Sequence, residues 1–298
     1  MKDDTPSGTA LLIARSLVFF APDPLIGPLV PARAVEASLA FLNACGGNAA
    51  RFQRLSGRAW FRALVAWAER QTIPGILSHF ILRKRFLEDC VRRALEDDFA
   101  QVVVLGAGFD TLALRLHYEC PAAAFLEVDH PATQRAKRRA LAARAPLAAN
   151  LSLVPLDFAQ AGLETLLSCA AYHPQARTLF VAEGLLMYLD SRQVNAVLAF
   201  MRDHSGPESR LAFTFMEPQK NGRVNFDHPS KAVDLWLRLR RERFQWGMSR
   251  DKIAPFMEAQ GFRVQELVTA EQLRQQYLPA AAASAHVNGD LICLAERR

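Results

Sequence analysis

The sequence predicts an α/β fold in which a mostly parallel β-sheet carries helices on both faces. From residue 101 onward, short apolar runs rich in β-branched residues alternate with helical segments. Glycine or acidic residues follow several of these runs directly. Regular alternation of strands and helices is typical of a doubly wound parallel sheet, whose strands are buried on both faces.

The first four strands are expected between residues 101 and 184. QVVVL at 101–105 is a continuous apolar run, as expected for a strand buried on both faces. The next three strands are AAFLEVD at 123–129, LSLVPL at 151–156 and TLFVAEG at 178–184. Helices are expected at 110–117 and from near Pro131, because a proline in the first helical turn loses no hydrogen bond.

The second half of the sheet follows residue 190. Asp190 and Ser191 can cap a helix over 193–202, because their side-chain oxygens can accept hydrogen bonds from its first turn. The remaining elements are a strand at 210–217, a helix at 251–259, a strand at 262–267 and a last strand at 291–296. A late closing strand fits an antiparallel edge of the sheet.

Residues 1–100 show no such alternation and are expected to form helices. Breaks are expected at 22–31, 46–47 and 74–75, where proline or glycine occurs. A helical insertion is expected at about 218–250. We therefore expect an N-terminal helical cap over 1–100 and a sheet domain over 101–298 that carries the insertion.

Composition limits the class of protein. Hydrophobic residues make up 51% and charged residues 22%, as in soluble globular proteins. No apolar run reaches the roughly 18 residues that a membrane span needs. The apolar run at 11–22 contains Arg15, and acidic residues precede it, which argues against a signal peptide. We expect a cytoplasmic protein without a membrane partner.

Metal and nucleic-acid sites are not indicated. The five cysteines form no C-x-x-C pair and no close Cys/His cluster, so we expect neither a zinc site nor a disulfide framework. The net charge is +6, with basic clusters at 83–85, 135–139 and 238–243. Each cluster has helical periodicity, for which a solvated helix face is the more frequent explanation. We therefore expect no nucleic-acid partner.

A glycine turn follows the first strand. In VVVLGAGFDT at 102–111, Gly106 and Gly108 remove side chains that would keep a ligand away from the backbone. A third glycine of the dinucleotide-binding pattern would fall at Thr111. Taken alone, the glycine pair is a weak signal, because structural turns explain many such pairs.

Acidic residues at strand ends strengthen this interpretation. Glu127 and Asp129 lie about twenty residues after the glycines, where a carboxylate can bind ribose hydroxyls, and Asp129 is better placed at the strand end. A salt bridge of Asp129 with Arg135 or Lys137 is the alternative. Two further acidic residues follow the third and fourth strands, Asp157 and Glu183. Ligands of open α/β sheets bind at this edge.

Five segments together resemble the leucine carboxyl methyltransferase family, including its bacterial branch of S-adenosylmethionine-dependent O-methyltransferases from polyketide and related pathways. They are LRKRFLED (82–89), QVVVLGAGFDTLALRL (101–116), FLEVDHP (125–131), PLDF (155–158) and EGLLMYL (183–189), in the family's order. SGTALLIARS at 7–16 is also similar to the bacterial branch. Leu114 departs from the family, since relatives often carry an aromatic residue there.

The resemblance implies a Rossmann-like class I methyltransferase sheet that binds S-adenosylmethionine, yields S-adenosylhomocysteine and needs no metal. It implies that Arg83 binds the methionine carboxylate, with Arg85 as the competing candidate; a bidentate guanidinium–carboxylate pair suits that role. Gly106 and Gly108 would lie under the methionine part, and Asp129 would hold the ribose.

The same resemblance assigns the rest of the cofactor site. Asp157 would accept a hydrogen bond from the adenine amino group, with Phe158 packed nearby. Glu183 would lie close to the methionine amino group. Tyr188 would face the methyl-transfer region, although a residue that fills core space is the alternative.

The acceptor is expected to be a small molecule with a carboxylate or a hydroxyl, apolar or aromatic and carrying an acidic group. A carboxylate needs no general base, whereas a hydroxyl needs one. No histidine is marked by a motif, so no catalytic base is assigned; His228 is the most interesting of the seven. Two helical faces are candidate pocket walls: Trp60, Leu64 and Trp67, and Trp236, Arg240 and Phe244.

Two alternatives remain open from the sequence. A nicotinamide-dependent oxidoreductase would use the same sheet and the same ribose carboxylate, but the missing third glycine argues against it. A non-catalytic binding module could keep the fold without turnover. Retention of Arg83, Asp129 and Glu183 favours a working cofactor site.

Overall fold

The computed structural model describes residues 6–142, 147–219, 222–226, 244–279 and 289–298. Most of the expected insertion at 218–250, with His228, Trp236 and Arg240, lies outside the described residues.

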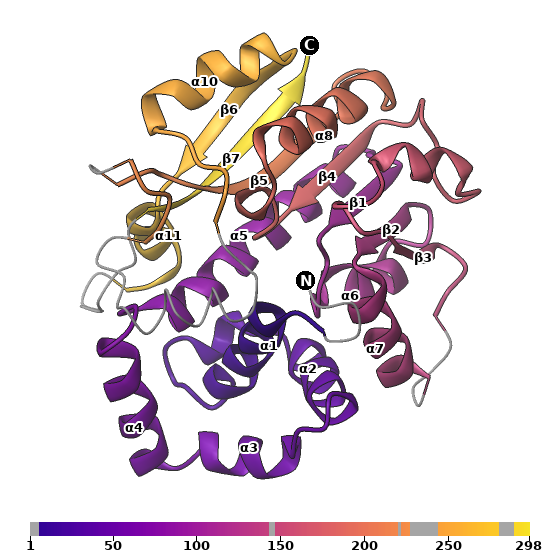
Figure 1. The fold of residues 1–298 in the computed structure, drawn as a ribbon. Helices are drawn as coiled ribbons and strands as arrows, with labels where there is room; N and C mark the ends of the chain where they lie inside the picture. Colours follow the sequence, from indigo (N-terminus) through magenta and orange to yellow (C-terminus); the bar gives the residue numbers. More distant parts are fainter. Residues whose placement is uncertain (1–5, 143–146, 220–221, 227–243, 280–288) are drawn as a thin grey trace.

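A seven-stranded sheet forms the centre of the molecule (Figure 1). Its strands are β1 (Gln101–Leu105), β2 (Ala124–Asp129), β3 (Leu151–Pro155), β4 (Thr178–Ala182), β5 (Arg210–Met216), β6 (Phe262–Val268) and β7 (Asp290–Arg297). They are ordered β3-β2-β1-β4-β5-β7-β6. β1 to β5 are parallel, and β7 is antiparallel to both of its neighbours. The predicted mostly parallel α/β sheet is confirmed.

The antiparallel strand does not form the edge that the sequence led us to expect. β7 lies between β5 and β6, so β6 occupies the edge. β7 pairs over its length with both neighbours, and its apolar residues are buried by the helices on the two faces. An apolar strand is better accommodated inside a sheet than at its edge, where its backbone groups would be unpaired.

Helices cover both faces of the sheet because alternate residues of each strand point to opposite sides. On β1, Val102 and Val104 pack into one apolar cluster, and Val103 and Leu105 pack into another. The first face is covered by α5 (Ile76–Glu96), α6 (Leu112–Glu119), α7 (Pro131–Leu141) and α11 (Ala270–Tyr277), and the second by α8 (Ser191–Asp203) and α10 (Arg250–Ala259). This is the expected doubly wound arrangement.

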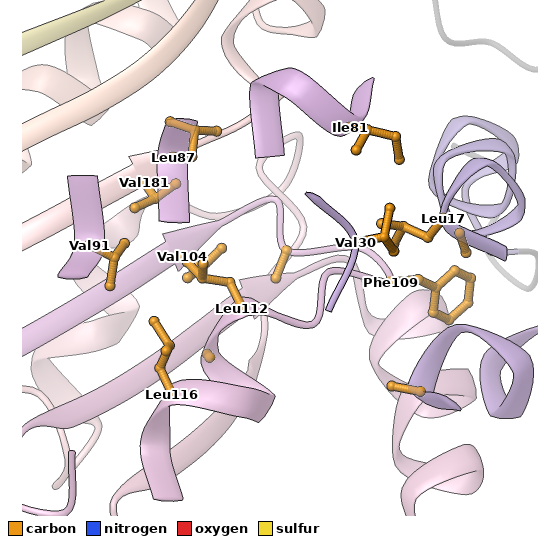
Figure 2. Close-up of a cluster of buried hydrophobic side chains, with 14 of the residues drawn as sticks. Leu17, Val30, Ile81, Leu87, Val91, Val104, Phe109, Leu112, Leu116 and Val181 are labelled. Atoms are coloured by element: carbon orange, nitrogen blue, oxygen red, sulfur yellow. The ribbon is translucent and has the colours of Figure 1, made fainter. Parts of the chain in front are cut away.

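Four N-terminal helices lie on the opposite side of the molecule from α8 and α10 (Figure 1). They are α1 (Gly8–Phe20), α2 (Ala32–Ala44), α3 (Ala49–Ser56) and α4 (Ala59–Arg70). Figure 2 shows that their core is continuous with that of the sheet: Leu17 of α1 lies near Phe109, and Ile81 of α5 lies near Val30. The predicted breaks are confirmed, and an additional break separates α3 from α4.

Among the described residues, no helix combines the length and the apolar character that crossing a membrane requires.

Candidate functional site

A cavity of about 660 Å³ lies outside the carboxyl ends of β1, β2 and β4. Strand register brings these ends together, since Leu105 pairs with Val128 and Asp129 pairs with Pro155. All eight predicted site residues line this cavity: Arg83, Gly106, Gly108, Asp129, Asp157, Phe158, Glu183 and Tyr188. The structure thus brings together all the residues of the predicted cofactor site, and their roles toward a cofactor remain predictions.

The two glycines of the turn after β1 have left-handed backbone angles, with φ of +63° at Gly106 and +51° at Gly108. A Cβ at Gly106 would lie 3.0 Å from Cδ1 of Leu185, and one at Gly108 would lie 3.0 Å from Cβ of Ala10. Only glycine satisfies both the φ angle and the close approach. The turn therefore presents bare backbone to the cavity and lets α1 pack against it.

Asp129 is fixed by the backbone around it. Its Oδ2 accepts a hydrogen bond from the Gly108 N–H, and its Oδ1 accepts one from the His130 N–H at 2.6 Å. Burial raises the pKa of Asp129 above its ordinary value, against the opposing effect of these two hydrogen bonds. The carboxylate thus ties the end of β2 to the glycine turn at the cavity wall.

Glu127, the other acidic residue of β2, does not line the cavity. It is fully buried and forms an ion pair with Nζ of Lys137, 2.5 Å from Oε2. Burial raises the pKa of Glu127 to about 7. Lys137 Nζ also donates to the backbone oxygen of Asp110 at 2.7 Å. A salt bridge to Lys137 was the alternative to ribose binding for a carboxylate of β2. This salt bridge is formed by Glu127, so Asp129 remains the candidate for ribose binding.

Arg83 lies at the bottom of the cavity in a cluster of buried charges. Its Nε donates to Oε1 of Glu183 at 2.9 Å, and its Nη1 donates to Oδ2 of Asp290 at 2.7 Å. Lys84 Nζ donates to the other oxygen of Glu183 at 2.9 Å and lies 3.2 Å from Oδ1 of Asp110. Two cations thus hold Glu183 at the end of β4.

The competing arginine does not reach the cavity. Arg85 lies on another face of α5, where its Nη2 pairs with Oδ1 of Asp89 at 2.6 Å. Arg83 is therefore the carboxylate-binding candidate. The expectation that the basic clusters form solvated helix faces is wrong at three positions, since Arg83 and Lys137 are buried and Lys84 is largely so. Their carboxylate partners make this burial tolerable.

Asp157 and Phe158 follow β3 and line the cavity beside His130 and Gln193. Oδ2 of Asp157 lies 3.6 Å from Nε2 of His130. Gln193 holds the backbone here, because its Nε2 donates to the oxygen of Phe158 at 2.9 Å. Gln193 is itself fixed by a capping box with Asp190 at the start of α8. The predicted cap at Asp190 is confirmed.

Tyr188 belongs to an apolar part of the cavity. It lies in the short 3₁₀ helix η3 (Leu186–Tyr188), and its ring packs against Phe244 with 5.4 Å between ring centroids. The other apolar lining residues here are Leu12, Ile13, Ile73, Ile76, Phe80, Met187 and Phe226. This half of the cavity suits an apolar ligand, which the polar strand ends do not.

One predicted pocket wall is wrong. Trp60, Leu64 and Trp67 of α4 are exposed by 61%, 51% and 56% and do not line the cavity. Their spacing correctly places them on one face of a helix, but that face points to solvent. The N-terminal helices contribute through α1 instead: residues 9, 10, 12 and 13 of this helix and its N-cap Ser7 line the cavity.

Sequence reasoning missed several residues of the site. They are Lys84, Asp110, His130, Gln193 and Asp290. His130 directly follows Asp129, and Asp110 lies two residues after Gly108, so the strand-end rule could have found both. Asp290 had no signal, because it reaches Arg83 across 207 residues of sequence.

No group of three or more histidine, cysteine or acidic side chains with a geometry suited to a metal ion occurs among the described residues.

Comparison with known proteins identifies the family. The family model described as leucine carboxyl methyltransferase matches residues 17–202. The chain belongs to the leucine carboxyl methyltransferase family. This match includes all eight predicted site residues, from Arg83 to Tyr188.

Alignments with relatives cover only part of each chain. A protein of Frankia alni, proposed to be an S-adenosyl-L-methionine-dependent methyltransferase, is 34% identical over 177 residues, which are 59% of this chain and 58% of the relative. One of Mycobacterium tuberculosis with the same proposed activity is 36% identical over 138 residues, 46% and 39% of the two chains. The chain thus spans about half the length of the curated relatives that it matches.

A solved structure supports the fold. A protein of Thermobifida fusca, proposed to be a methyltransferase, aligns with a TM-score of 0.55 at 19% identity. The alignment covers 87% of this chain and 93% of that one. At this identity the likeness concerns the fold alone.

Proposed function

We propose that this member of the leucine carboxyl methyltransferase family is an S-adenosylmethionine-dependent methyltransferase. The observation that carries the proposal is the meeting of the glycine turn, Asp129 and the Arg83–Glu183 pair in one cavity. Each group matches one part of the cofactor: a backbone surface, a ribose-binding carboxylate and a charged pair for an amino acid.

The chemistry of these donors and acceptors fits the cofactor. Oxygens of Asp129 would accept hydrogen bonds from ribose hydroxyls, and Glu183 would bind the ammonium group of the methionine part. Glu183 accepts from Nε of Arg83, and Asp290 accepts from one N–H of Nη1. N–H groups of Nη1 and Nη2 therefore remain on the outer edge of the guanidinium, where they can bind a carboxylate end-on. Asp157 would accept from the adenine amino group, with Phe158 beside it.

When bound, S-adenosylmethionine would supply an electrophilic methyl carbon for in-line displacement. The protein's part is to orient the two reactants and to exclude water. Positioning of this kind lowers such barriers by roughly 7–11 kcal/mol. No described residue is assigned as a catalytic base.

Calorimetric titration tests the cofactor class. We would titrate the protein with S-adenosylmethionine, S-adenosylhomocysteine and NADH, and repeat each titration with Asp129→Ala. The control is Glu127→Gln, because Glu127 lies two residues earlier on the same strand and outside the cavity. We expect binding of the first two ligands alone, weakened at least about tenfold by Asp129→Ala, or about 1.4 kcal/mol, and unchanged by the control.

Other outcomes separate the alternatives. Binding of NADH alone would make the protein a nicotinamide-dependent oxidoreductase. Binding of none of the three ligands would favour a non-catalytic module that kept the fold.

For the acceptor we propose O-methylation of a carboxylate or hydroxyl on a small apolar or aromatic molecule with an acidic group, of the polyketide type or a peptide carboxyl end. The apolar half of the cavity, with Phe80, Tyr188, Phe226 and Phe244, supports an apolar acceptor. The cytoplasmic setting and the absence of nucleic-acid or membrane partners stand as predictions beside it.

Methyl uptake from labelled S-adenosylmethionine tests the acceptor across aromatic acids, aliphatic acids, phenols and amines. We expect acids or phenols with an aromatic body to react. Phe226→Ala should raise the KM of a reactive acceptor while leaving S-adenosylhomocysteine binding unchanged. Methylation of amines alone would contradict O-methylation, and reaction of phenols alone would exclude a carboxylate acceptor.

A further inference from the structure

Asp290 is a buried carboxylate that no sequence motif marks and that does not itself line the cavity. It begins β7 and is exposed by 2%. Its Oδ2 accepts two hydrogen bonds, from Nη1 of Arg83 at 2.7 Å and from Nε2 of His79 at 2.8 Å. Both donors belong to α5 and lie four residues apart, so they project from the same side of that helix.

The contacts of Arg83 show what Asp290 does. Glu183 accepts from Nε and Asp290 accepts from Nη1, so the guanidinium is held by two carboxylates, one just after β4 and one at the start of β7. Because the guanidinium is planar and rigid, two such contacts fix its orientation. Gly184 lies on the remaining side, where a Cβ would be 3.7 Å from Nη2. Without a side chain there, the free edge of Arg83 remains accessible from the cavity.

Asp290 remains charged in this surrounding. Burial acts to raise its pKa, but the charge of Arg83 and the hydrogen bond from His79 hold the pKa below its ordinary value. An ionised carboxylate forms shorter and stronger hydrogen bonds to a guanidinium than a neutral group does. The contact with His79 in turn restricts the carboxylate to one rotamer.

We propose that Asp290, held by His79, is a positioning residue that aims the free edge of Arg83 at the carboxylate of the cofactor's methionine part. This inference rests on the proposed cofactor. It assigns to the antiparallel strand β7 a role in the site, although β4 and β5 separate β7 from β1, the strand that the glycine turn follows.

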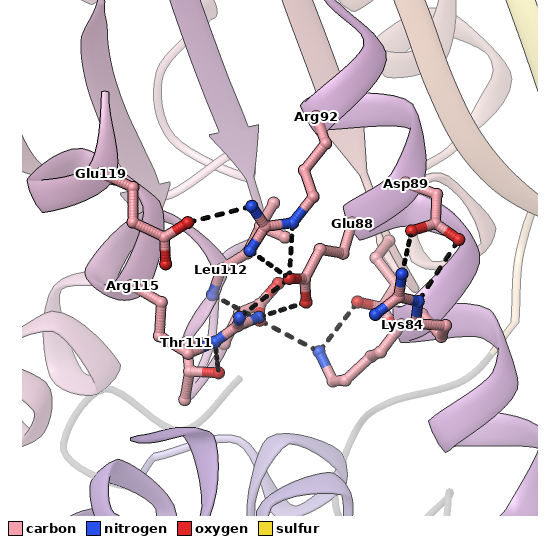
Figure 3. A network of polar contacts seen from close by, with 11 residues as sticks. Lys84, Glu88, Asp89, Arg92, Thr111, Leu112, Arg115 and Glu119 are labelled. Carbon is pink, nitrogen blue, oxygen red and sulfur yellow. Dashed lines mark hydrogen bonds and ion pairs between the residues drawn. The ribbon is translucent and has the colours of Figure 1, made fainter. Parts of the chain in front are cut away.

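A merely structural role for Asp290 gives a different expectation, and Glu88 provides the matched control. Glu88 of α5 is also a buried carboxylate, and it pairs with Arg115 of α6, whose Nη1 lies 3.0 Å from Oε1 and whose Nη2 lies 2.6 Å from Oε2 (Figure 3). It does not line the cavity. Glu88→Gln therefore removes a buried negative charge from α5, the helix that carries Arg83, without removing a contact of Arg83.

The experiment is a cycle of two ligands and four proteins. S-adenosylhomocysteine and its decarboxylated analogue, which lacks the methionine carboxylate, are titrated calorimetrically into wild type, Asp290→Asn, His79→Gln and Glu88→Gln. Thermal unfolding of each protein is recorded beside the titrations. A cycle of this kind isolates the coupling between the protein group and the ligand group.

We expect Asp290→Asn to weaken S-adenosylhomocysteine at least about tenfold, which is about 1.4 kcal/mol. The decarboxylated analogue should be weakened less than about twofold, because Arg83 no longer has a carboxylate to bind. His79→Gln should show the same selectivity with a smaller loss. Glu88→Gln should lower the unfolding temperature and leave the affinity for both ligands unchanged.

Other results of the Asp290→Asn titrations would contradict the inference. Equal weakening of both ligands by Asp290→Asn would show a general structural role, and no weakening would show no role. If Asp290→Asn does not fold, His79→Gln decides by the same comparison of the two ligands. Wild type that binds neither ligand would overturn the proposed cofactor, and the inference with it, whereas the first two outcomes overturn the inference alone.

Discussion

At Gly108 the missing side chain decides how closely α1 approaches the glycine turn. Gly108→Ala would place a Cβ 3.0 Å from that of Ala10 at a φ of +51°. Gly46→Ala is its matched control, because Gly46 has a φ of +79° with nothing within 4 Å of a Cβ. We expect Gly46→Ala to cost about 1 kcal/mol of unfolding free energy from φ strain, and Gly108→Ala to cost at least about 1 kcal/mol more.

Urea unfolding of the two variants measures this difference, and titration with S-adenosylhomocysteine follows the site. Gly108→Ala should also weaken the ligand, because the turn and α1 both line the cavity. Equal unfolding free energies for the two alanine variants would show that α1 moves away from the added Cβ without loss of stability.

Residues of the site were predictable where sequence places them beside a strand end. Gly106, Asp129 and Glu183 each follow or end an apolar run, so the rule that ligands bind at carboxyl ends was sufficient. The sequence favoured Asp129 over Glu127 because Asp129 ends the strand. The structure adds that Glu127 pairs with Lys137 outside the cavity. Asp290 was beyond reach, because nothing local relates it to Arg83.

Among the elements, α8 links a helix cap to the cavity. The capping box of Asp190 and Gln193 orients Gln193, whose Nε2 holds the backbone oxygen of Phe158. Asp190→Ala should cost about 1 kcal/mol of unfolding free energy and also weaken S-adenosylhomocysteine. Thr269→Ala removes the equivalent box of α11, which does not line the cavity, and should cost a similar amount without changing ligand affinity.

Urea unfolding and calorimetry of these two variants make the comparison. If Thr269→Ala weakened the ligand as much as Asp190→Ala does, the effect would come from general stability and not from Phe158.

The junction of α5 and α6 carries a pH dependence. Burial acts to raise the pKa of Glu88, but hydrogen bonds and charge from Arg115 and Arg92 lower it below 4.5, its ordinary value. A carboxylate with a lowered folded pKa contributes stability that is present above pH 4.5 and lost as the pH falls through the folded pKa. Glu88→Gln should cost about 3 kcal/mol at pH 7.

Urea unfolding at pH 7 and pH 3 checks the sign. Wild type should lose more unfolding free energy between these values than Glu88→Gln does, because the variant has no charge to lose there. The opposite order would mean that Glu88 is neutral in the folded protein at pH 7.

Strand and helix positions followed from apolar runs and caps, whereas strand order did not. Each of β1 to β7 was predicted within two residues of its observed bounds, because a buried strand gives a short run of apolar residues in the sequence. The insertion of β7 between β5 and β6 depends on pairing between segments that are distant in the sequence, which local sequence patterns do not predict. The exposed face of α4 shows the same limit, since periodicity defines a face but not its neighbour.

At the scale of the whole molecule, the N-terminal helices and the sheet share a core and a cavity. Ala10 contacts the glycine turn, and further residues of α1 line the cavity. S-adenosylhomocysteine at 100 times its Kd should stabilise the folded state by about 2.7 kcal/mol. Hydrogen exchange should show added protection in α1 and in the turn, beyond the change in α10 on the far side.

Exchange followed by mass spectrometry with and without the ligand tests this. Equal changes in α1 and α10 would mean that the ligand acts on global stability alone and that α1 does not respond locally.

The place of Asp290 in the chain also has a consequence for synthesis on the ribosome. Arg83 emerges 207 residues before its partner, an interval of about 10 to 40 s at bacterial-to-eukaryotic translation rates of 5–20 residues per second. Throughout that interval the nascent chain can hold α5 and the first five strands, but Arg83 lacks its second anchor. If Asp290 aims Arg83 as proposed, a nascent polypeptide becomes competent to select its ligand only after β7 has left the exit tunnel.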